Sequence, residues 1–283
     1  MHAQSRRLRA AILTALFPCL ALVVAAGQGK QPARVVPLRQ GHAHNDYEHP
    51  RPLLDALEHG FCSVEADIFL VDGELLVGHT RKDLRPGRTL TKLYLDPLRQ
   101  RSKASGGRVY AGGPTIFLLI DVKSAAKETY AALARELARY DDILSVTRDG
   151  KFEPKAVTVV VSGNCDRDAI TAQKVRHAAI DGRPPDLDAT APAHLIPWVS
   201  ANWKLVFSWR GEGPMPEAER TKLREFVAKA HKGGRLVRFW ATPESPVVWQ
   251  ELLAAGVDLI NTDRLAELRR FLLDRGAGRE PGK

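Results

Sequence analysis

The chain has 283 residues, of which 44% are hydrophobic, and its 42 Lys and Arg against 33 Asp and Glu give a formal net charge of +9. This length suits one large α/β domain or two small ones, and the apolar share excludes disorder along the whole chain. The 3 Cys exclude a disulfide scaffold and a Cys-rich zinc fold. The positive balance suits an anionic substrate or surface, without choosing among phosphoesters, lipids and nucleic acid.

The first 26 residues predict a secretory signal peptide. Arg6, Arg7 and Arg9 form a basic start, and an uncharged apolar run follows at positions 10–26. We therefore expect residues 27–283 to form a single domain of a secreted or periplasmic protein. A retained N-terminal anchor is the alternative, which Pro18 disfavours because it interrupts the apolar run.

Short apolar runs alternate with amphipathic ones along the rest of the chain. Strands are predicted at residues 35–44, 62–70, 115–123, 156–163, 204–209, 236–241 and 257–261. Helices are predicted at residues 52–59, 126–140, 166–177, 217–232, 246–255 and 265–275. This alternation is typical of a parallel α/β fold, and the length suits a TIM-like (β/α)₈ barrel. A doubly wound sheet is the alternative, but no G-x-G-x-x-G follows the first strand.

One further strand, at residues 74–79, does not fit this alternation. The three residues before it are too few for a parallel crossover, so it folds back as a hairpin through Asp72 and Gly73, or the barrel is irregular here. The long loops at 80–113 and 181–195 are candidates for the rim of a site.

Two acidic residues alternate along the predicted strand at 62–70. Because successive side chains of a strand point to opposite faces, Glu65 and Asp67 share one face. Neighbouring carboxylates inside a barrel repel each other unless a cation lies between them, and such oxygen ligands suit Mg²⁺ or Ca²⁺. The alternative is that these acids pair with Lys or Arg near the rim.

The predicted strand at 115–123 ends in another polar pair. Asp121 and Lys123 follow an apolar run and share one face. Barrel active sites lie at the carboxyl ends of the strands. Asp121 is therefore a candidate third oxygen ligand and Lys123 a candidate phosphate contact, with a purely structural Asp–Lys pair as the alternative.

Histidines end two of the predicted strands. His42 and His44 close the first strand, and His79 closes the strand at 74–79. Two imidazoles that face each other across a metal can act as general base and general acid.

Later strands supply candidate substrate contacts. Arg238 and Trp240 share a face of the strand at 236–241, and Arg210 follows the strand at 204–209. The simpler interpretation is that Trp240 only packs.

In this order, the motifs resemble those of the PLC-like phosphodiesterase superfamily, which includes glycerophosphodiester phosphodiesterases, phosphatidylinositol-specific phospholipases C and sphingomyelinases D of the spider-venom type. The opening GHAHNDYEHPRPLLDAL is most similar to the subgroup named for altered inheritance of mitochondria protein 6. The matching residues are His44 and Asn45, Glu65 and Asp67, Asp72 and Gly73 leading to His79, Asp121 and Lys123, Trp240, and the closing segments 256–258 and 262–263.

The resemblance implies a TIM-like barrel, one divalent cation and acid–base catalysis by two histidines. Carried over, it places the metal on Glu65, Asp67 and Asp121, phosphate on Lys123, and one catalytic role on His79. The other catalytic histidine is His42 by the sphingomyelinase pattern or His44 by the phospholipase C pattern, which also makes Asn45 a metal ligand. We favour His44. The H-R-G and P-E-N motifs of glycerophosphodiesterases are absent.

The sequence thus predicts a secreted phosphodiesterase that uses Mg²⁺ or Ca²⁺ and two histidines. We expect a small-molecule or lipid phosphodiester as substrate, allow contact with a membrane surface, and expect a monomer that does not bind nucleic acid. An amidohydrolase-type zinc hydrolase, suggested by His42 and His44, is one alternative. A non-catalytic barrel that binds phosphate or lipid headgroups is another.

Overall fold

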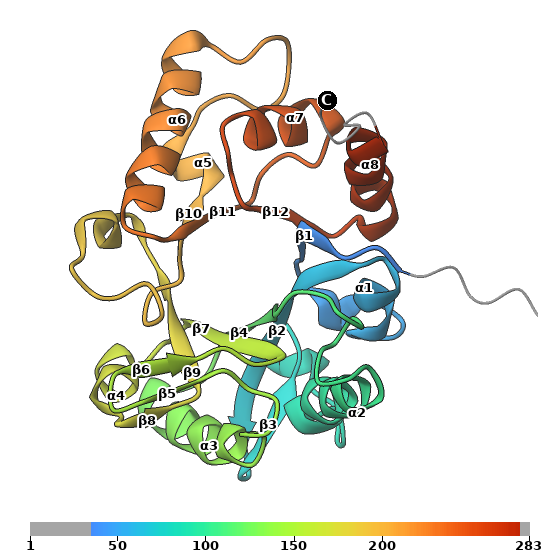
Figure 1. The fold of residues 1–283 in the computed structure, drawn as a ribbon, viewed down its shortest axis with the longest axis vertical. Coiled ribbons are helices and arrows are strands. Elements are labelled where there is room, and N and C mark those ends of the chain that lie inside the picture. The colour runs from blue at the N-terminus through green and yellow to red at the C-terminus, as the bar shows by residue number, and fades with distance from the viewer. Residues whose placement is uncertain (1–34, 278–283) are drawn as a thin grey trace, which may run out of the picture. The chain divides into compact units, whose positions relative to one another are not determined.

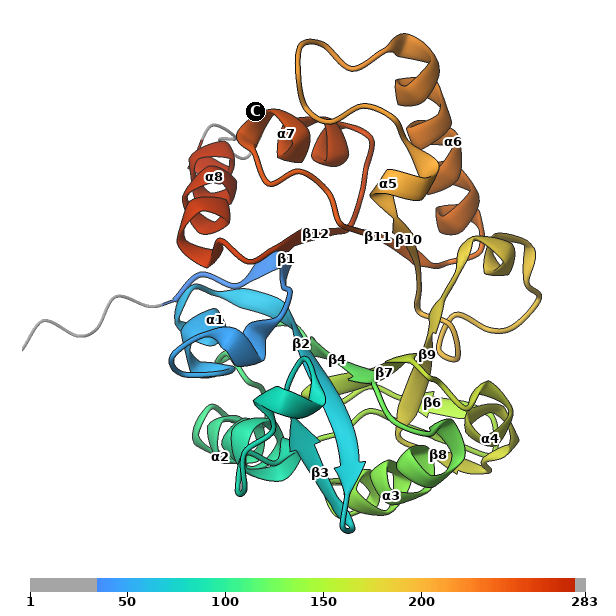
Figure 2. The ribbon, with the colours of Figure 1, turned by 180° about the vertical axis from the view of Figure 1, so that it is seen from behind.

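Eight parallel strands close into a barrel in the computed structural model, which describes residues 35–277. Around the barrel the strands pair in the order β1-β2-β4-β7-β9-β10-β11-β12, and β12 pairs with β1 (Figures 1 and 2). They are β1 (Leu38–Ala43), β2 (Phe61–Val71), β4 (Ile116–Val122), β7 (Val157–Gly163), β9 (Ala178–Gly182), β10 (Trp198–Asn202), β11 (Leu236–Trp240) and β12 (Leu259–Thr262). The TIM-like barrel expected from the sequence is confirmed, and the closure excludes a doubly wound sheet. The predicted signal peptide at 1–26 lies outside the described residues.

Helices lie outside the ring of strands (Figures 1 and 2). They are α1 (Leu54–Glu58), α2 (Asp96–Ala104), α3 (Ala126–Ala138), α4 (Arg167–Ala172), α5 (Trp203–Val206), α6 (Glu217–Lys232), α7 (Pro246–Ala254) and α8 (Leu265–Ala277). In α6 the buried residues Leu223, Val227 and Ala230 recur at the spacing of one helix face. Between residues 35 and 277, no helix is long and apolar enough to cross a membrane.

Strand alternation divides the apolar side chains into two cores. Inward-pointing residues fill the barrel and form a separate cluster, made of Leu119, Val160, Ala179, Trp198 and Leu259. Outward-pointing residues pack under the helices and form the main core. Toward the carboxyl ends of the strands the inward positions become polar, and this change creates a polar mouth on an apolar barrel.

The predicted hairpin is confirmed. β3 (Glu74–Val77) pairs antiparallel with the end of β2. Asp72 and Gly73 both have positive φ values, of 48° and 84°, as a two-residue type I′ turn requires. The hairpin carries the chain back toward the barrel, so His79 follows β3 close to Asp67 of β2. A second small sheet has the order β6 (Lys151–Glu153), β5 (Val146–Arg148), β8 (Val175–Arg176).

The strand predicted at 204–209 is wrong, because the barrel strand lies just before it, in β10. The side chain of Asn202 accepts a hydrogen bond from the Lys204 N–H (2.9 Å) and starts the short helix α5. The apolar residues that suggested a strand serve packing instead. The rings of Trp203 and Phe207 lie tilted against each other at a centroid distance of 4.2 Å, and Phe239 packs against both.

Other differences concern short elements. The helix predicted at 166–177 ends at Ala172, and the rest of that range contains a bend and β8. β9 was not predicted, because its sequence AAIDG is small and brief, and the loop predicted at 181–195 begins inside it. The loop predicted at 80–113 contains α2.

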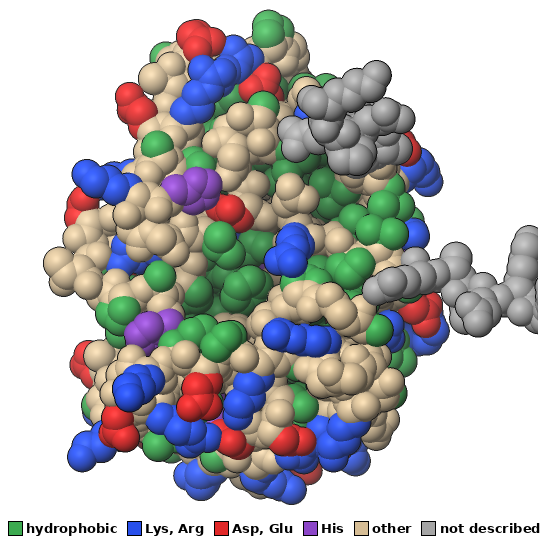
Figure 3. Space-filling view, in the orientation of Figure 1, with side chains coloured by type: hydrophobic (Ala, Val, Ile, Leu, Met, Phe, Trp, Pro, Cys, Tyr) green, Lys and Arg blue, Asp and Glu red, His purple; other side chains and the backbone are tan. Residues whose placement is uncertain are grey.

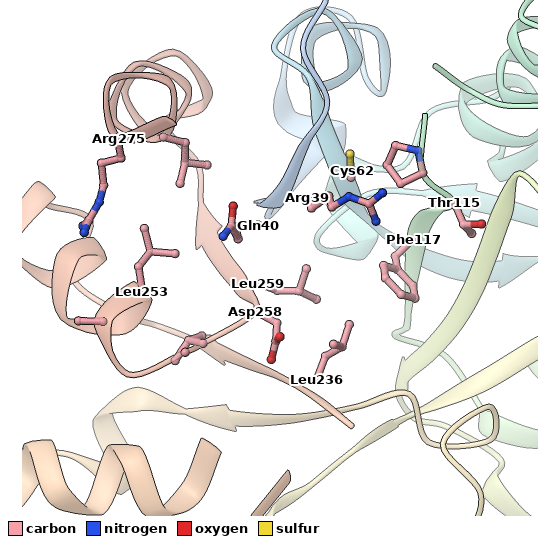
Figure 4. Close-up of a pocket in the computed structure, with 15 residues that line it drawn as sticks. Arg39, Gln40, Cys62, Thr115, Phe117, Leu236, Leu253, Asp258, Leu259 and Arg275 are labelled. Carbon is pink, nitrogen blue, oxygen red and sulfur yellow. The ribbon is translucent and has the colours of Figure 1, made fainter. Parts of the chain in front are cut away.

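A cavity of about 680 Å³ lies where the barrel strands begin, at the end away from the polar mouth. Figure 4 shows Gln40, Phe117, Leu236 and Leu259 around it. Hydrophobic side chains also gather at the centre of the face in Figure 3. No candidate site residue lines this cavity, so it is not the predicted site.

We expect no disulfide in the folded domain. Cys62 lies at the start of β2 and Cys165 just beyond the end of β7, toward opposite ends of the barrel, and both are free thiols. Thiol titration of unfolded, unreduced protein comprising residues 27–283 should find both thiols. A titration that detects almost no free thiol would contradict this arrangement.

Candidate active site

Three carboxylates converge at the carboxyl ends of β2 and β4. Glu65 and Asp67 come from β2, and Asp121 comes from β4, where it pairs in register with Asp67. One oxygen of each carboxylate lies within 4.8 Å of the others. Glu65 and Asp67 are buried, and Asp121 is partly exposed. The two polar strand ends singled out in the sequence therefore form one cluster.

The buried guanidinium of Arg238 keeps Glu65 ionised. The Arg238 Nη2 donates to Glu65 Oε2 (2.6 Å), and the same guanidinium donates to Asn261 Oδ1 (3.0 and 2.8 Å). Burial alone would raise the pKa of Glu65, but Arg238 and the hydrogen bond from His42 hold that pKa far below its usual range. Glu65 is therefore a permanent carboxylate, and Arg238 is committed to it.

The other two carboxylates share one lysine. Lys123 Nζ donates to Asp121 Oδ2 (2.8 Å) and lies 3.1 Å from Asp67 Oδ2. Burial and the neighbouring charge of Glu65 raise the pKa of Asp67 to about 6, and burial also raises the pKa of Asp121 despite its bond from Lys123. The Oδ1 atoms of Asp67 and Asp121 are buried and have no hydrogen-bond partner within the described chain.

These observations fit a divalent cation. Three carboxylates against two cations leave the cluster one charge negative, and the two unpaired oxygens are hard ligands of the kind that Mg²⁺ and Ca²⁺ bind. Gly163 of β7 leaves room for Asp121, because a Cβ atom at this position would lie 1.9 Å from Asp121 Oδ1. Only glycine fits beside that carboxylate.

The two histidines of the first strand have different surroundings. His42 is fully buried, and both ring nitrogens are engaged, Nδ1 with Ser63 Oγ (2.7 Å) and Nε2 with Glu65 Oε2 (3.1 Å). Burial and the charge of Arg238 lower the pKa of His42 to about 4, so it is neutral at pH 7.

His44 is partly exposed at the mouth. Its Nδ1 donates to Asp263 Oδ1 (2.7 Å), and its Nε2 makes no hydrogen bond to the part of the chain that the structure describes. Burial would lower the pKa of His44, but the hydrogen bond to Asp263 and the charge of Glu65 raise it overall.

His79 has an arrangement similar to that of His44. Its Nδ1 lies 3.1 Å from Asp67 Oδ2 and 3.0 Å from the Tyr47 hydroxyl, and its side chain is 54% exposed. The Tyr47 hydroxyl also lies 2.7 Å from both Asn45 Oδ1 and Asp67 Oδ2. Tyr47 thus links the candidate ligand Asn45, the acidic cluster and His79.

Comparison with known proteins now identifies the family. A profile of the AIM6-like phosphodiesterase domain matches residues 31–181, and one of the glycerophosphoryl diester phosphodiesterase family matches residues 237–266. The chain belongs to the AIM6-like phosphodiesterase family.

Relatives of this AIM6-like chain are similar over most of its length. Altered inheritance of mitochondria protein 6 from Eremothecium gossypii is 31% identical, over 83% of this chain and 69% of its own. The homolog from Arthroderma benhamiae is 28% identical, over 78% of this chain and 80% of its own. A solved glycerophosphodiester phosphodiesterase from Agrobacterium tumefaciens shares the fold, with a TM-score of 0.50 and 16% identity over 84% of this chain and 100% of that chain.

Two sequence candidates lie apart from the acidic cluster of this AIM6-like domain. Arg210 donates to the carbonyls of Phe207 and Trp209 (2.7 and 3.2 Å) and, within residues 35–277, makes no ion pair with the cluster. Trp240 ends β11 and is 37% exposed, so it is available at the rim.

Several functional neighbours escaped the sequence reasoning. Tyr47 directly follows the His44–Asp46 motif, but nothing in a single sequence reveals that its hydroxyl reaches β2. Ser63 was visible only as an inward position two residues before Glu65. Asn261 ends the strand predicted at 257–261 and Asp263 belongs to the closing motif, but the sequence does not reveal their partners Arg238 and His44.

A buried acid supports the loop that carries Tyr47. Asp46 Oδ2 accepts hydrogen bonds from the Leu53 N–H (2.5 Å) and the Tyr94 hydroxyl (2.9 Å), while Oδ1 is buried without a partner within the described residues. Burial raises the pKa of Asp46 to about 7, although these two hydrogen bonds oppose the shift.

We expect Asp46 to make the domain less stable as the pH rises. Because its pKa is higher in the folded chain than the ordinary value of 3.8, its contribution to stability is complete below that value and is lost as the pH rises through about 7. The loss is at most about 1.4 kcal/mol per pH unit. Urea unfolding at pH 5 and pH 8 should show a smaller drop for the Asp46→Asn variant, which keeps the acceptor oxygen. Equal drops in variant and wild type would contradict the assignment.

Proposed function

We propose that this chain hydrolyses a phosphodiester at the barrel mouth with the help of a divalent cation, Mg²⁺ or Ca²⁺. The observation that carries the proposal is the cluster of Glu65, Asp67 and Asp121, in which two buried carboxylate oxygens have no hydrogen-bond partner among residues 35–277. Membership of a phosphodiesterase family supports the reaction class.

The three carboxylates would hold the cation, with Asn45 as a further candidate ligand. When bound, the cation would polarise a non-bridging phosphoryl oxygen and offset its charge. Lys123 is placed to supply positive charge to the same phosphate once Asp67 and Asp121 have another partner. With a divalent cation the cluster would carry one net positive charge, which matches the single negative charge of a phosphodiester.

Two imidazoles are built for proton transfer. His44 and His79 each have Nδ1 beside a carboxylate, which would place the proton on Nδ1 in the neutral ring and leave the Nε2 lone pair for proton transfer. The raised pKa of His44 favours it as the acid that protonates the leaving oxygen. His79 would then take the proton from the attacking water or from a hydroxyl of the substrate.

His42 would position these groups rather than transfer protons. Both of its nitrogens are engaged and it has no exposed surface, so it has no free lone pair for a substrate. Its bond to Glu65 orients that carboxylate toward the cluster.

We further propose a small phosphodiester, such as a glycerophosphodiester or a phospholipid headgroup, as the substrate, and Trp240 at the rim as a contact for it. The Agrobacterium tumefaciens protein that shares the fold is named as a glycerophosphodiester phosphodiesterase. Export of the chain, predicted from residues 1–26, belongs to the same proposal.

The zinc hydrolase alternative is less well supported by the geometry. His42 and His44 point to different partners, Glu65 and Asp263. Among residues 35–277, the one group of three potential ligands that lie close enough for a metal contains only carboxylates. Stoichiometric zinc in purified protein would favour this alternative.

The Asp121→Asn substitution should weaken both cation binding and catalysis. It removes one ligand charge yet leaves the buried Glu65–Arg238 pair intact, so the fold should survive. We expect Mg²⁺ or Ca²⁺ affinity, measured by calorimetry, and turnover of an aryl phosphodiester each to fall by at least roughly 10- to 100-fold. Asp142→Asn, which removes a surface acid paired with Arg99, is the matched control. Unchanged turnover in the Asp121→Asn variant would refute the proposal.

Substitution of the two first-strand histidines should separate catalysis from stability. We expect His44→Ala to lower kcat by roughly 10²- to 10⁴-fold with little change in urea unfolding. His42→Ala should instead lower the free energy of unfolding by about 2 kcal/mol or more, because it leaves a cavity, takes the hydrogen-bond partner from the buried Ser63 hydroxyl and removes one of the hydrogen bonds to Glu65. A fully active His44→Ala variant, combined with a stable but inactive His42→Ala variant, would reverse the two roles.

A further inference from the structure

A row of inward-facing polar side chains continues past the acidic cluster. Asp121 of β4 pairs in register with Ser162 of β7. Because Val161 pairs with Ile180, Ser162 in turn lies beside Asp181 of β9. The row brings Arg183, two residues after Asp181, to the same mouth.

Asp181 is an anchor rather than a free acid. It is 4% exposed, and it accepts hydrogen bonds from Ser162 Oγ (2.8 Å), Trp198 Nε1 (2.6 Å) and Arg183 Nη1 (2.5 Å). Arg183 Nη2 also donates to Ser162 Oγ (2.9 Å). One edge of the guanidinium, formed by Nη1 and Nη2, is therefore fixed to the barrel wall.

The other edge of the guanidinium is free. Within the described residues, Arg183 Nε makes no hydrogen bond and Nη2 keeps a second proton, while the side chain is 41% exposed. Nε–H and Nη2–H are parallel donors that match two oxygens of one phosphate group.

The backbone of Arg183 is also held in place. Its N–H donates to Asp186 Oδ2 (2.7 Å), and Pro184 and Pro185 restrict the following turn. Arg167 makes two bonds to the same Asp186 (2.7 and 3.2 Å). A long, partly exposed side chain that is held at both its backbone and one guanidinium edge loses little entropy when it binds an anion.

We propose that the free Nε–Nη2 edge of Arg183 binds phosphoryl oxygens of the substrate from the β9 side of the acidic cluster. This inference rests on the proposed function, which puts the phosphate at that cluster. Lys123 contacts Asp67 and Asp121 from β4, so the two cations would hold one phosphate group from neighbouring parts of the mouth. The competing interpretation is that Arg183 only neutralises Asp181.

Inorganic phosphate is the probe for this contact. We would titrate it into the full chain in saturating MgCl₂ by calorimetry and measure kcat/KM for an aryl phosphodiester in parallel. Arg183→Gln should weaken phosphate binding and lower kcat/KM by roughly 10- to 100-fold each, the value of a charge-assisted, two-bond contact. Arg183→Lys keeps the charge beside Asp181 but loses the paired donors, so it should protect the fold while still weakening phosphate binding.

Lys229→Gln is the matched control, because it removes a surface cation that pairs with Asp188 (2.7 Å), at the end of the turn that follows Arg183. It should bind phosphate like wild type. The inference is wrong if both Arg183 variants keep the phosphate affinity and the kcat/KM of wild type. If turnover still depends on Asp121 in that case, the proposed function stands. Phosphate binding that depends on Arg183 in a chain without turnover would support the inference and refute the proposed function. Full affinity in Arg183→Lys would overturn the two-donor contact.

Discussion

The repulsion among three carboxylates at one end of the barrel is the constraint on which the rest of the site depends. Inside the barrel, Arg238 offsets the negative charge of Glu65. At the mouth, Lys123 offsets part of the charge of Asp67 and Asp121. The two pairings differ in kind. The Arg238 pair is buried, whereas Lys123 is partly exposed at the mouth. Under the proposed function, a cation would replace Lys123 between Asp67 and Asp121, and Lys123 would then contact the phosphate.

The barrel makes this concentration of charge possible. Below the mouth, inward-pointing aliphatic side chains and Trp198 form an apolar layer, and the acidic cluster lies above it at the carboxyl ends of the strands. Several strand ends carry a polar side chain of the site, and a second residue orients that side chain. Asp263 holds His44, Asn261 holds Arg238, and Asp181 holds Arg183. Asp263 and His44 lie at opposite ends of the domain sequence, and the closed sheet brings them together. Asn261 comes from the strand next to that of Arg238, and Asp181 lies two residues before Arg183.

The sequence predicted the parts of the site that lie within one strand. Glu65 with Asp67, and Asp121 with Lys123, could be assigned to single faces by alternation alone, and the barrel followed from the order of strands and helices. Pairings between strands could not be read, because no local pattern encodes which inward residues meet across the barrel. The Glu65–Arg238 pair is of this kind, and the contacts of Tyr47 with Asp67 and His79 likewise join segments that are distant in the sequence.

Errors in the strand assignment arose where packing overrides local preference. Residues 204–209 have a strand-like composition, yet Trp203 and Phe207 pack against Phe239 outside the barrel, and the capping side chain of Asn202 turns the chain into a helix. β9 was missed because its small residues carry little apolar signal. That omission also hid Asp181 and Arg183, which the loop interpretation had left without a defined position.

The central claim is that the three carboxylates share one cation. Crystals soaked in Mn²⁺, a spectroscopic and scattering substitute for Mg²⁺, would test it most directly through an anomalous difference map. We predict one peak bound by Glu65 and by the Oδ1 atoms of Asp67 and Asp121, with Lys123 displaced from at least one of its carboxylates. A map with no peak there, and with the Lys123 and Arg238 pairings unchanged, would contradict the claim.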